Sequence, residues 1–166
     1  VYTTTTSGDI ILTGTTTASA DDAQMNSVDA INGAGLVTAS TVDLNAATGI
    51  GNTTPLNLAA TTITADNSAS GNVDLNNALG TAVSVTTLTT AGGGNIVFDQ
   101  TGGGAVSFGT VSTVADGTPA EGEADITLTS DSGNLTIATS VTAAGLGDIV
   151  YTTTTSGDII LTGTTT

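Results

Sequence analysis

The chain has 166 residues and carries 15 acidic side chains but no Lys, Arg, His or Cys, so its formal net charge is -15. Without cationic side chains it cannot neutralise phosphates or anionic lipid headgroups, which excludes nucleic acid as a partner. The absence of Cys excludes a disulfide framework and a thiolate metal site.

The composition favours a folded chain over a disordered one. Hydrophobic residues make up 38% of the sequence, and Val, Ile, Leu and Thr recur at the spacing of β-strands. No apolar run approaches the roughly 20 residues that span a bilayer, so we expect no transmembrane segment. The start lacks the basic and apolar regions of a signal peptide. If the protein is secreted, we therefore expect this chain to be an internal piece of it.

The first element along the chain is a long repeat. Residues 1–17, "VYTTTTSGDIILTGTTT", return without a single difference as residues 150–166, and we call them the two copies of the repeated segment. We interpret residues 1–149 as one repeat block and residues 150–166 as the start of the next identical block. An engineered duplication is the alternative.

The next stretch, residues 26–70, has a less regular pattern. The sequence "NSVDAINGAGLVTAS" at 26–40 predicts a partial extra turn. We read "TVDL" at 41–44 and "LNLAATTIT" at 56–64 as the two strands of a single turn, joined by the long connection 45–55.

From residue 71 a short repeat emerges. The stretches "GNVDL", "GNIVF", "ADITL" and "GDIVY" begin at residues 71, 94, 124 and 147, and each is followed roughly ten residues later by a second apolar stretch. Aligned as rows, they give three apolar columns. The first column is Val73, Ile96, Ile126 and Ile149; the second is Leu75, Phe98, Leu128 and Tyr151; the third is Val85, Phe108, Ile137 and Leu161.

Columns of this kind are what a parallel β-helix requires, because the same position of successive turns stacks about 4.8 Å apart along the axis. We predict an all-β fold, a parallel β-helix (β-solenoid) with about 5–7 turns per block and these columns as its core. Apolar and polar side chains alternate along each strand, which points one face inward and the other to water. Unequal spacing of the rows predicts loops of different length at one corner.

The rows resemble the repeat regions of large bacterial exoproteins of the filamentous haemagglutinin type, which are exported by two-partner secretion. The resemblance rests on the "G-[DN]-I-x-L" strands at 8–12, 94–98, 147–151 and 157–161, and on "TVDLNAATGIG" at 41–51. It implies a right-handed β-helical shaft in an extracellular adhesin or surface fibre. The chain departs from that pattern in lacking Lys and Arg and in repeating its block without divergence, which favours a structural filament.

The residue types argue against catalysis. No His is present as a general base, and no Lys or Arg can stabilise a developing anion, so we expect neither an enzyme nor a cofactor. Carboxylates can gather Ca²⁺, and two weak candidate sets are Asp21, Asp22 and Asp29, and Glu121, Glu123 and Asp125. Neither set matches a known calcium loop, so solvated surface acids are the default interpretation.

Three smaller features concern turn residues, aromatic residues and threonines. Asp9, Asp148 and Asp158 precede apolar stretches, where we expect their side chains to shape turns or cap strand ends. The aromatic residues Tyr2, Phe98, Phe108 and Tyr151 fall in apolar columns, which predicts core packing. The Thr runs at 3–6 and 15–17 raise an ice-binding hypothesis, but Thr-x-Thr recurs only intermittently in the aligned rows.

The leading functional hypothesis is a structural segment of an acidic, protease-resistant, extracellular or cell-surface bacterial fibre of the biofilm type, whose blocks stack end to end with further copies. We expect the carboxylates to keep neighbouring fibres apart at neutral pH, and divalent cations to weaken that repulsion. The alternative is the shaft of a large adhesin with a separate binding domain. An ice-binding or carbohydrate-active β-helix is the least favoured.

Overall fold

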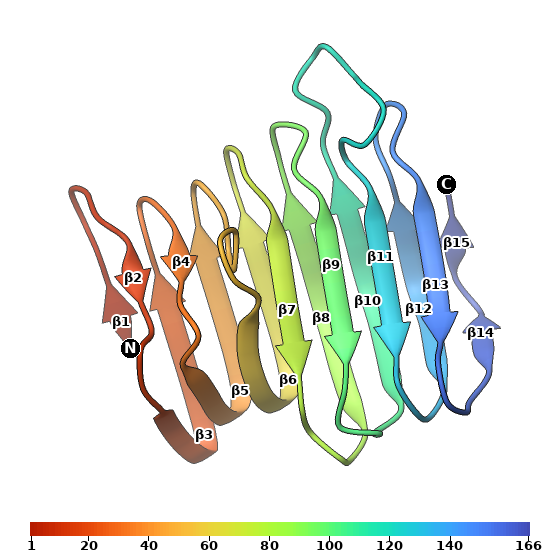
Figure 1. Cartoon of the computed structure of the whole chain (residues 1–166), viewed down its shortest axis with the longest axis horizontal. Coiled ribbons are helices and arrows are strands. Elements are labelled where there is room, and N and C mark those ends of the chain that lie inside the picture. Colours follow the sequence, from red (N-terminus) through yellow and green to blue (C-terminus); the bar gives the residue numbers. More distant parts are fainter.

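The computed structural model describes residues 1–166 and shows a chain coiled in about seven turns around one long axis, without any helix. Strands at the front of Figure 1 run downward and those behind run upward as the chain advances from left to right, so the coil is right-handed. All strand pairs are parallel. The predicted fold, a right-handed β-solenoid, is confirmed.

Fifteen strands make up the coil. Their bounds are β1 Tyr2–Thr3, β2 Ile10–Ile11, β3 Thr16–Asn26, β4 Ile31–Asn32, β5 Leu36–Ala46, β6 Leu56–Asn67, β7 Val73–Asn77, β8 Val83–Thr90, β9 Ile96–Gln100, β10 Val106–Thr113, β11 Ile126–Ser130, β12 Leu135–Thr142, β13 Ile149–Thr153, β14 Ile159–Leu161 and β15 Thr164–Thr165.

Two long sides face each other across the core. Side A contains β7, β9, β11 and β13, and side B contains β1, β8, β10, β12, β14 and β15. The long strands β3, β5 and β6 bend and contribute to both sides; β6, for example, pairs with β7 through its first half and with β8 through its second. At the end of side B the chain bends and crosses to side A of the next turn. We call this bend the return corner.

Each turn has a loop in or after side A, and the position of this loop changes midway along the coil. In the early turns a loop separates Ile50 from Leu56, and the bend from side A to side B is tight. From Val73 onward side A is continuous, and the loop lies between the two sides instead. This shift makes the reading of residues 26–70 wrong. Segment 41–44 pairs with 62–65, so the two belong to successive turns of side B rather than to one turn.

Residues 26–40 are likewise not a partial extra turn. Ile31 pairs with both Ile10 and Ile50, which places it in the first column of a complete turn. Leu36 then begins the side A half of β5. The first column therefore runs through seven turns: Ile10, Ile31, Ile50, Val73, Ile96, Ile126 and Ile149.

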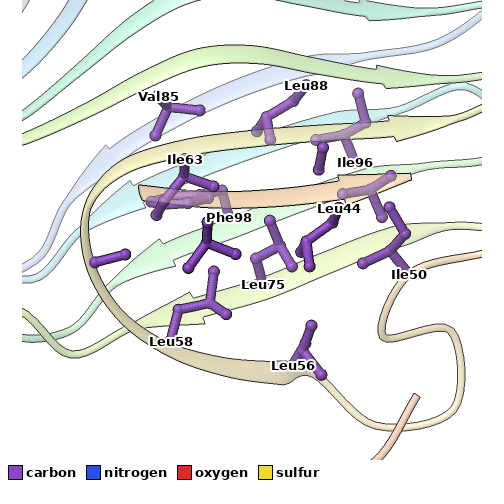
Figure 2. Packing of buried hydrophobic residues seen from close by; sticks show 14 of the residues in the cluster. Leu44, Ile50, Leu56, Leu58, Ile63, Leu75, Val85, Leu88, Ile96 and Phe98 are labelled. Carbon is purple, nitrogen blue, oxygen red and sulfur yellow. The ribbon is translucent and has the colours of Figure 1, made fainter. Parts of the chain in front are cut away.

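The core is a single cluster of 31 buried residues that follows the axis. Figure 2 shows Leu75 and Phe98 of side A and Ile63 and Val85 of side B directed toward one another between the strands. The second column has Leu75, Phe98, Leu128 and Tyr151 in register, and the third has Val85, Phe108, Ile137 and Leu161 in register. Side chains of like shape thus stack on one another from turn to turn.

Candidate functional site

Asp and Asn residues just before the first column form a hydrogen-bonded ladder along the return corner. Asn95 Oδ1 accepts the backbone N–H of Asp125 at 2.9 Å, and Asp125 Oδ1 accepts that of Asp148 at 2.8 Å. Asp9 Oδ1 accepts the N–H of Ala30 at 3.0 Å in the same way. Each side chain satisfies a backbone donor of the following turn, which is the physical reason for the "G-[DN]-I" pattern.

The ladder is open at its C-terminal end. Asp148 belongs to the last turn, so its carboxylate faces no further backbone donor. A second ladder runs along the start of side B, where Asn134 Oδ1 accepts the N–H of Asp158 at 3.0 Å. Both ladders propagate in one direction, from each turn to the one that follows it. The last turn therefore presents the same ladder groups as the turns before it.

Buried polar side chains hold the return corner in shape. Asn67 Nδ2 donates to the carbonyls of Ser70 and Gly71, both at 2.8 Å, while its Oδ1 accepts the N–H of Gly49 at 2.8 Å. Thr113, in register with Thr90 of the neighbouring turn, donates to the carbonyl oxygen of Ala124 at 2.9 Å and so closes the long loop that follows it. These bonds fix the path of the backbone at the return corner.

The two calcium candidates do not assemble. Asp21 Oδ1 is bonded to the N–H of Asp22, and Asp29 Oδ2 to the N–H of Gly8. Asp125 belongs to the corner ladder. Glu121 is exposed, and Glu123 Oε2 is buried without a hydrogen-bond partner. No group of three or more acidic side chains could hold a metal ion. One oxygen each of Asp21, Asp29 and Asp125 accepts a backbone N–H, and the six carboxylates do not converge on one point.

One aspartate on the outer surface of side A titrates abnormally. Partial burial raises the pKa of Asp74 above its ordinary value, and the negative charge of Asp99 on the neighbouring strand raises it further. The two residues lie one pleat apart on adjacent strands, because Asp74 pairs with Val97 and Asn76 pairs with Asp99. No cation stands between them, since the chain has no basic side chain.

The outer surface of side B carries a regular array of hydroxyl groups, which we call the hydroxyl face. Successive turns place Thr and Ser in register in three parallel rows. The rows are Thr62, Ser84, Ser107 and Thr136; Thr64, Thr87, Thr110, Ser140 and Thr164; and Thr89, Ser112 and Thr142. Aligned sequence rows hid this array, because register shifts at Ile63/Thr64 and Phe108/Thr110 displace the hydroxyl positions by one residue. Counting back from the return corner in each turn would have revealed it.

The two copies of the repeated segment occupy different places around the coil. Tyr2 pairs with Met25 on side B, whereas its counterpart Tyr151 pairs with Leu128 on side A. Tyr2 lies on the first turn and is 46% exposed, so the prediction that it packs in the core is wrong. The open end leaves one of its faces without a neighbouring turn.

The same difference holds further along the repeated segment. Ile10 pairs with Ile31 in the first column, whereas its counterpart Ile159 pairs with Leu135 at the start of side B. One sequence thus forms a parallel β-ladder in two positions half a turn apart. The segment suits both because apolar residues and turn residues alternate in it at the spacing that either side requires.

Two open hollows are present; one is lined by Thr4, Ser27 and Val28 among others, and the second by Val1, Asp22 and Asp43 among others. No helix of the structure is long and apolar enough to cross a membrane.

The fold places the chain in the class of β-solenoids. No protein-family model, no curated protein and no solved structure matches it.

Proposed function

We propose that the chain is a structural segment of an extracellular bacterial fibre built from β-solenoid blocks stacked end to end, with further copies of the block as its partners. The observation that carries the proposal is that the repeated segment forms a parallel β-ladder with a neighbouring turn at both of its positions. An unpaired strand edge is a template for another strand. The repeated segment supplies a chain that forms such a ladder.

The C-terminal end exposes side chains that are buried in every earlier turn of side B. Leu161 is 54% exposed and Ile159 is 43% exposed, although they continue columns in which Ile137 and Leu135 are fully buried. A turn placed on this end would remove their apolar surface from water, which stabilises the contact by about 25 cal/mol per Å². Solenoids need either a polar cap or another turn at such an end.

The charge and composition suit a durable surface fibre. Fifteen acidic side chains without basic partners repel neighbouring fibres at neutral pH, and salt or divalent cations screen that repulsion. The chain contains no Lys or Arg for trypsin to cleave. Its ladder also leaves few loose segments for other proteases. These properties support an extracellular location and cation-dependent bundling.

Electron microscopy and light scattering of the purified chain test the proposal. Leu161→Lys places a charge in the open third column, whereas Thr136→Lys places the same charge on the outer surface of the preceding turn. We expect concentration-dependent filaments from the parent chain and from Thr136→Lys, and a loss of filaments with Leu161→Lys. Scattering should rise as calcium is added. No filaments from the parent chain, or a flat calcium titration, would count against the fibre.

The hydroxyl face supports a second candidate function, the ordering of water or ice. Its rows repeat about every 4.8 Å along the axis, and the second and third rows lie about 6.6 Å apart along each strand, from the geometry of parallel sheets. A rigid lattice of hydroxyl and methyl groups can hold surface water in a regular pattern. Thermal hysteresis tests it: Thr110→Tyr should abolish the effect, and Thr127→Tyr on side A should leave it intact. Absence of hysteresis in the parent chain would dismiss the candidate.

A further inference from the structure

We propose that, where one block follows another in a single chain, the last turn of the first block replaces the first turn seen here. Ile31 of the following block then stacks directly on Ile149, and residues 18–30 leave the ladder to form a loop at the return corner. This inference deepens the proposed function and rests on it. It gives six turns per block of 149 residues, that is, from Ile31 through Ile149.

The chain itself imposes a choice between the two positions of the repeated segment. In a tandem chain, residue 150 of one block is residue 1 of the next, so the segment cannot lie in both. After Thr142 ends side B, the chain reaches Tyr151 in far fewer residues than any turn of the coil contains. It can cross the return corner to side A, but it cannot pass side A and reach side B again. The C-terminal position is therefore the one that an internal copy can take.

The ladder at the return corner accepts this replacement. Asp148 and Asp9 both follow a Gly and precede a first-column Ile. Asp9 Oδ1 here accepts the N–H of Ala30 at 3.0 Å. In the junction, the open carboxylate of Asp148 accepts that same N–H from Ala30 of the following block. The donor and the acceptor are both already present.

The inward columns also continue across the junction. Register places Thr153 where Thr16 lies, under Val37. Leu161 takes the place of Ala23 and stacks on Val42. Thr165 takes the place of Met25 and stacks on Leu44. Leu in place of Ala adds volume and Thr in place of Met removes volume, so these two changes partly offset each other.

The length of the displaced segment matches a loop that the coil already contains. Ala18 falls just past the end of side B in the junction, at the position that Thr113 and Ala143 occupy in their turns. Ala18 and Ile31 are as far apart in sequence as Thr113 and Ile126, whose connection is the longest return-corner loop of the structure. The coil therefore tolerates a loop of this length at this corner. Six turns at about 4.8 Å predict an axial repeat of about 29 Å.

Engineered disulfides in a two-block chain test the junction, since the natural sequence has no Cys. The chain would contain residues 1–149 followed by residues 1–166, with Cys pairs in the second block only. Gln24 and Asp43 are register neighbours here, joined by a 2.9 Å hydrogen bond. Thr15 of the second block is the residue equivalent to Thr164, whose register row leads back to Asp43. In the junction, Thr15 therefore lies next to Asp43 of the same block. Neighbours in a parallel ladder meet the Cα separation that a disulfide needs.

We expect Thr15→Cys with Asp43→Cys to oxidise almost completely in the two-block chain, and Gln24→Cys with Asp43→Cys to remain largely reduced. The 166-residue chain with the same pairs is the matched control and should give the reverse result. Mass spectrometry after mild oxidation measures both, and circular dichroism verifies the β-fold. A closed Gln24→Cys/Asp43→Cys bridge in the second block, or no bridge from either pair, would overturn the junction.

The outcomes separate this inference from the fibre itself. Filaments from a two-block chain whose Gln24→Cys/Asp43→Cys bridge stays closed would refute the junction but keep the fibre. A two-block chain that closes the Thr15→Cys/Asp43→Cys bridge yet forms no filament would keep the junction and refute assembly of separate chains.

Discussion

Phe98 and Phe108 meet edge to face in the core, with ring centroids 5.3 Å apart and ring planes at 90°. Phe98 comes from β9 on side A and Phe108 from β10 on side B of the same turn, and both are fully buried. The pair joins the second column to the third across the width of the coil. Edge-to-face contact brings the positive edge of one ring to the negative face of the other.

Truncating either ring should destabilise the chain strongly. We expect Phe98→Ala or Phe108→Ala to lower the free energy of unfolding by about 3–5 kcal/mol, because each leaves a cavity in a closely packed layer. Phe98→Leu should cost less, since Leu75 and Leu128 occupy the same column. Chemical denaturation measures each change. The double variant should reveal a coupling of about 0.5–1.5 kcal/mol, and purely additive losses would contradict a direct ring contact.

Sequence reasoning succeeded where the chain repeats at a regular spacing. From Val73 onward, apolar residues two positions apart mark side A, and a short gap precedes side B, so aligned rows reproduce the spatial columns. The same reasoning failed before Val73, because the loop there lies inside the side A half of each turn. Ile50 and Leu56 are separated by six positions, yet they stack on Val73 and Leu75, which are two apart.

No sequence pattern identifies the residue that accommodates this change of corner. Ala60 lies in the tight bend of β6. In the next turn, β7 ends at Asn77 and a loop begins at Ala78, so no strand backbone pairs with Ala60 on that side. The side chain of Asn77 takes the place of that strand: its Oδ1 accepts the N–H of Ala60 at 3.0 Å, and its Nδ2 donates to the carbonyl of Ala60 at 3.1 Å. An Asn in a core column is invisible to an apolar alignment.

Removing that amide should therefore be costly. We expect Asn77→Ala to lower the free energy of unfolding by more than about 2 kcal/mol, because it leaves the buried N–H and C=O of Ala60 unpaired. It also removes the 2.9 Å bond from Asn77 to Gln100. Asn76→Ala, one residue earlier on the outer surface, is the matched control and should change stability by less than about 0.5 kcal/mol. Equal effects of the two variants in urea unfolding would disprove the role of Asn77.

Close stacking at the return corner should make one glycine irreplaceable. A Cβ added to Gly94 would lie 2.0 Å from the carbonyl oxygen of Gly71 in the neighbouring turn, so the backbone would have to move. We expect Gly94→Ala to lower the melting temperature markedly. Gly14→Ala is the control, because nothing lies within 4 Å of its added Cβ and its φ is not left-handed. A differential scanning calorimetry trace that shifts equally for both would rule out steric exclusion.

The raised pKa of Asp74 predicts a specific pH dependence of stability. Because burial and the charge of Asp99 disfavour its ionised form in the native state, Asp74 binds its proton more tightly when the chain is folded. The stabilisation that comes from this protonation is fully present below the pKa that Asp74 has in the unfolded chain. It is lost as the pH rises through the higher pKa that Asp74 has in the native state. Asp74→Asn should therefore stabilise the chain at neutral pH and reduce the decline of stability between acidic and neutral pH.

Urea unfolding at a series of pH values measures this effect, with the parent chain as the reference. Asp99→Asn should produce a smaller change of the same sign, because it removes the neighbouring charge and leaves the burial of Asp74. Asp158→Asn, an exposed aspartate far from this pair, serves as the control for the loss of one negative charge. The same pH profile for Asp74→Asn and Asp158→Asn would contradict a specific role of the Asp74–Asp99 pair. General charge repulsion among the fifteen acidic side chains would then govern the pH dependence of stability.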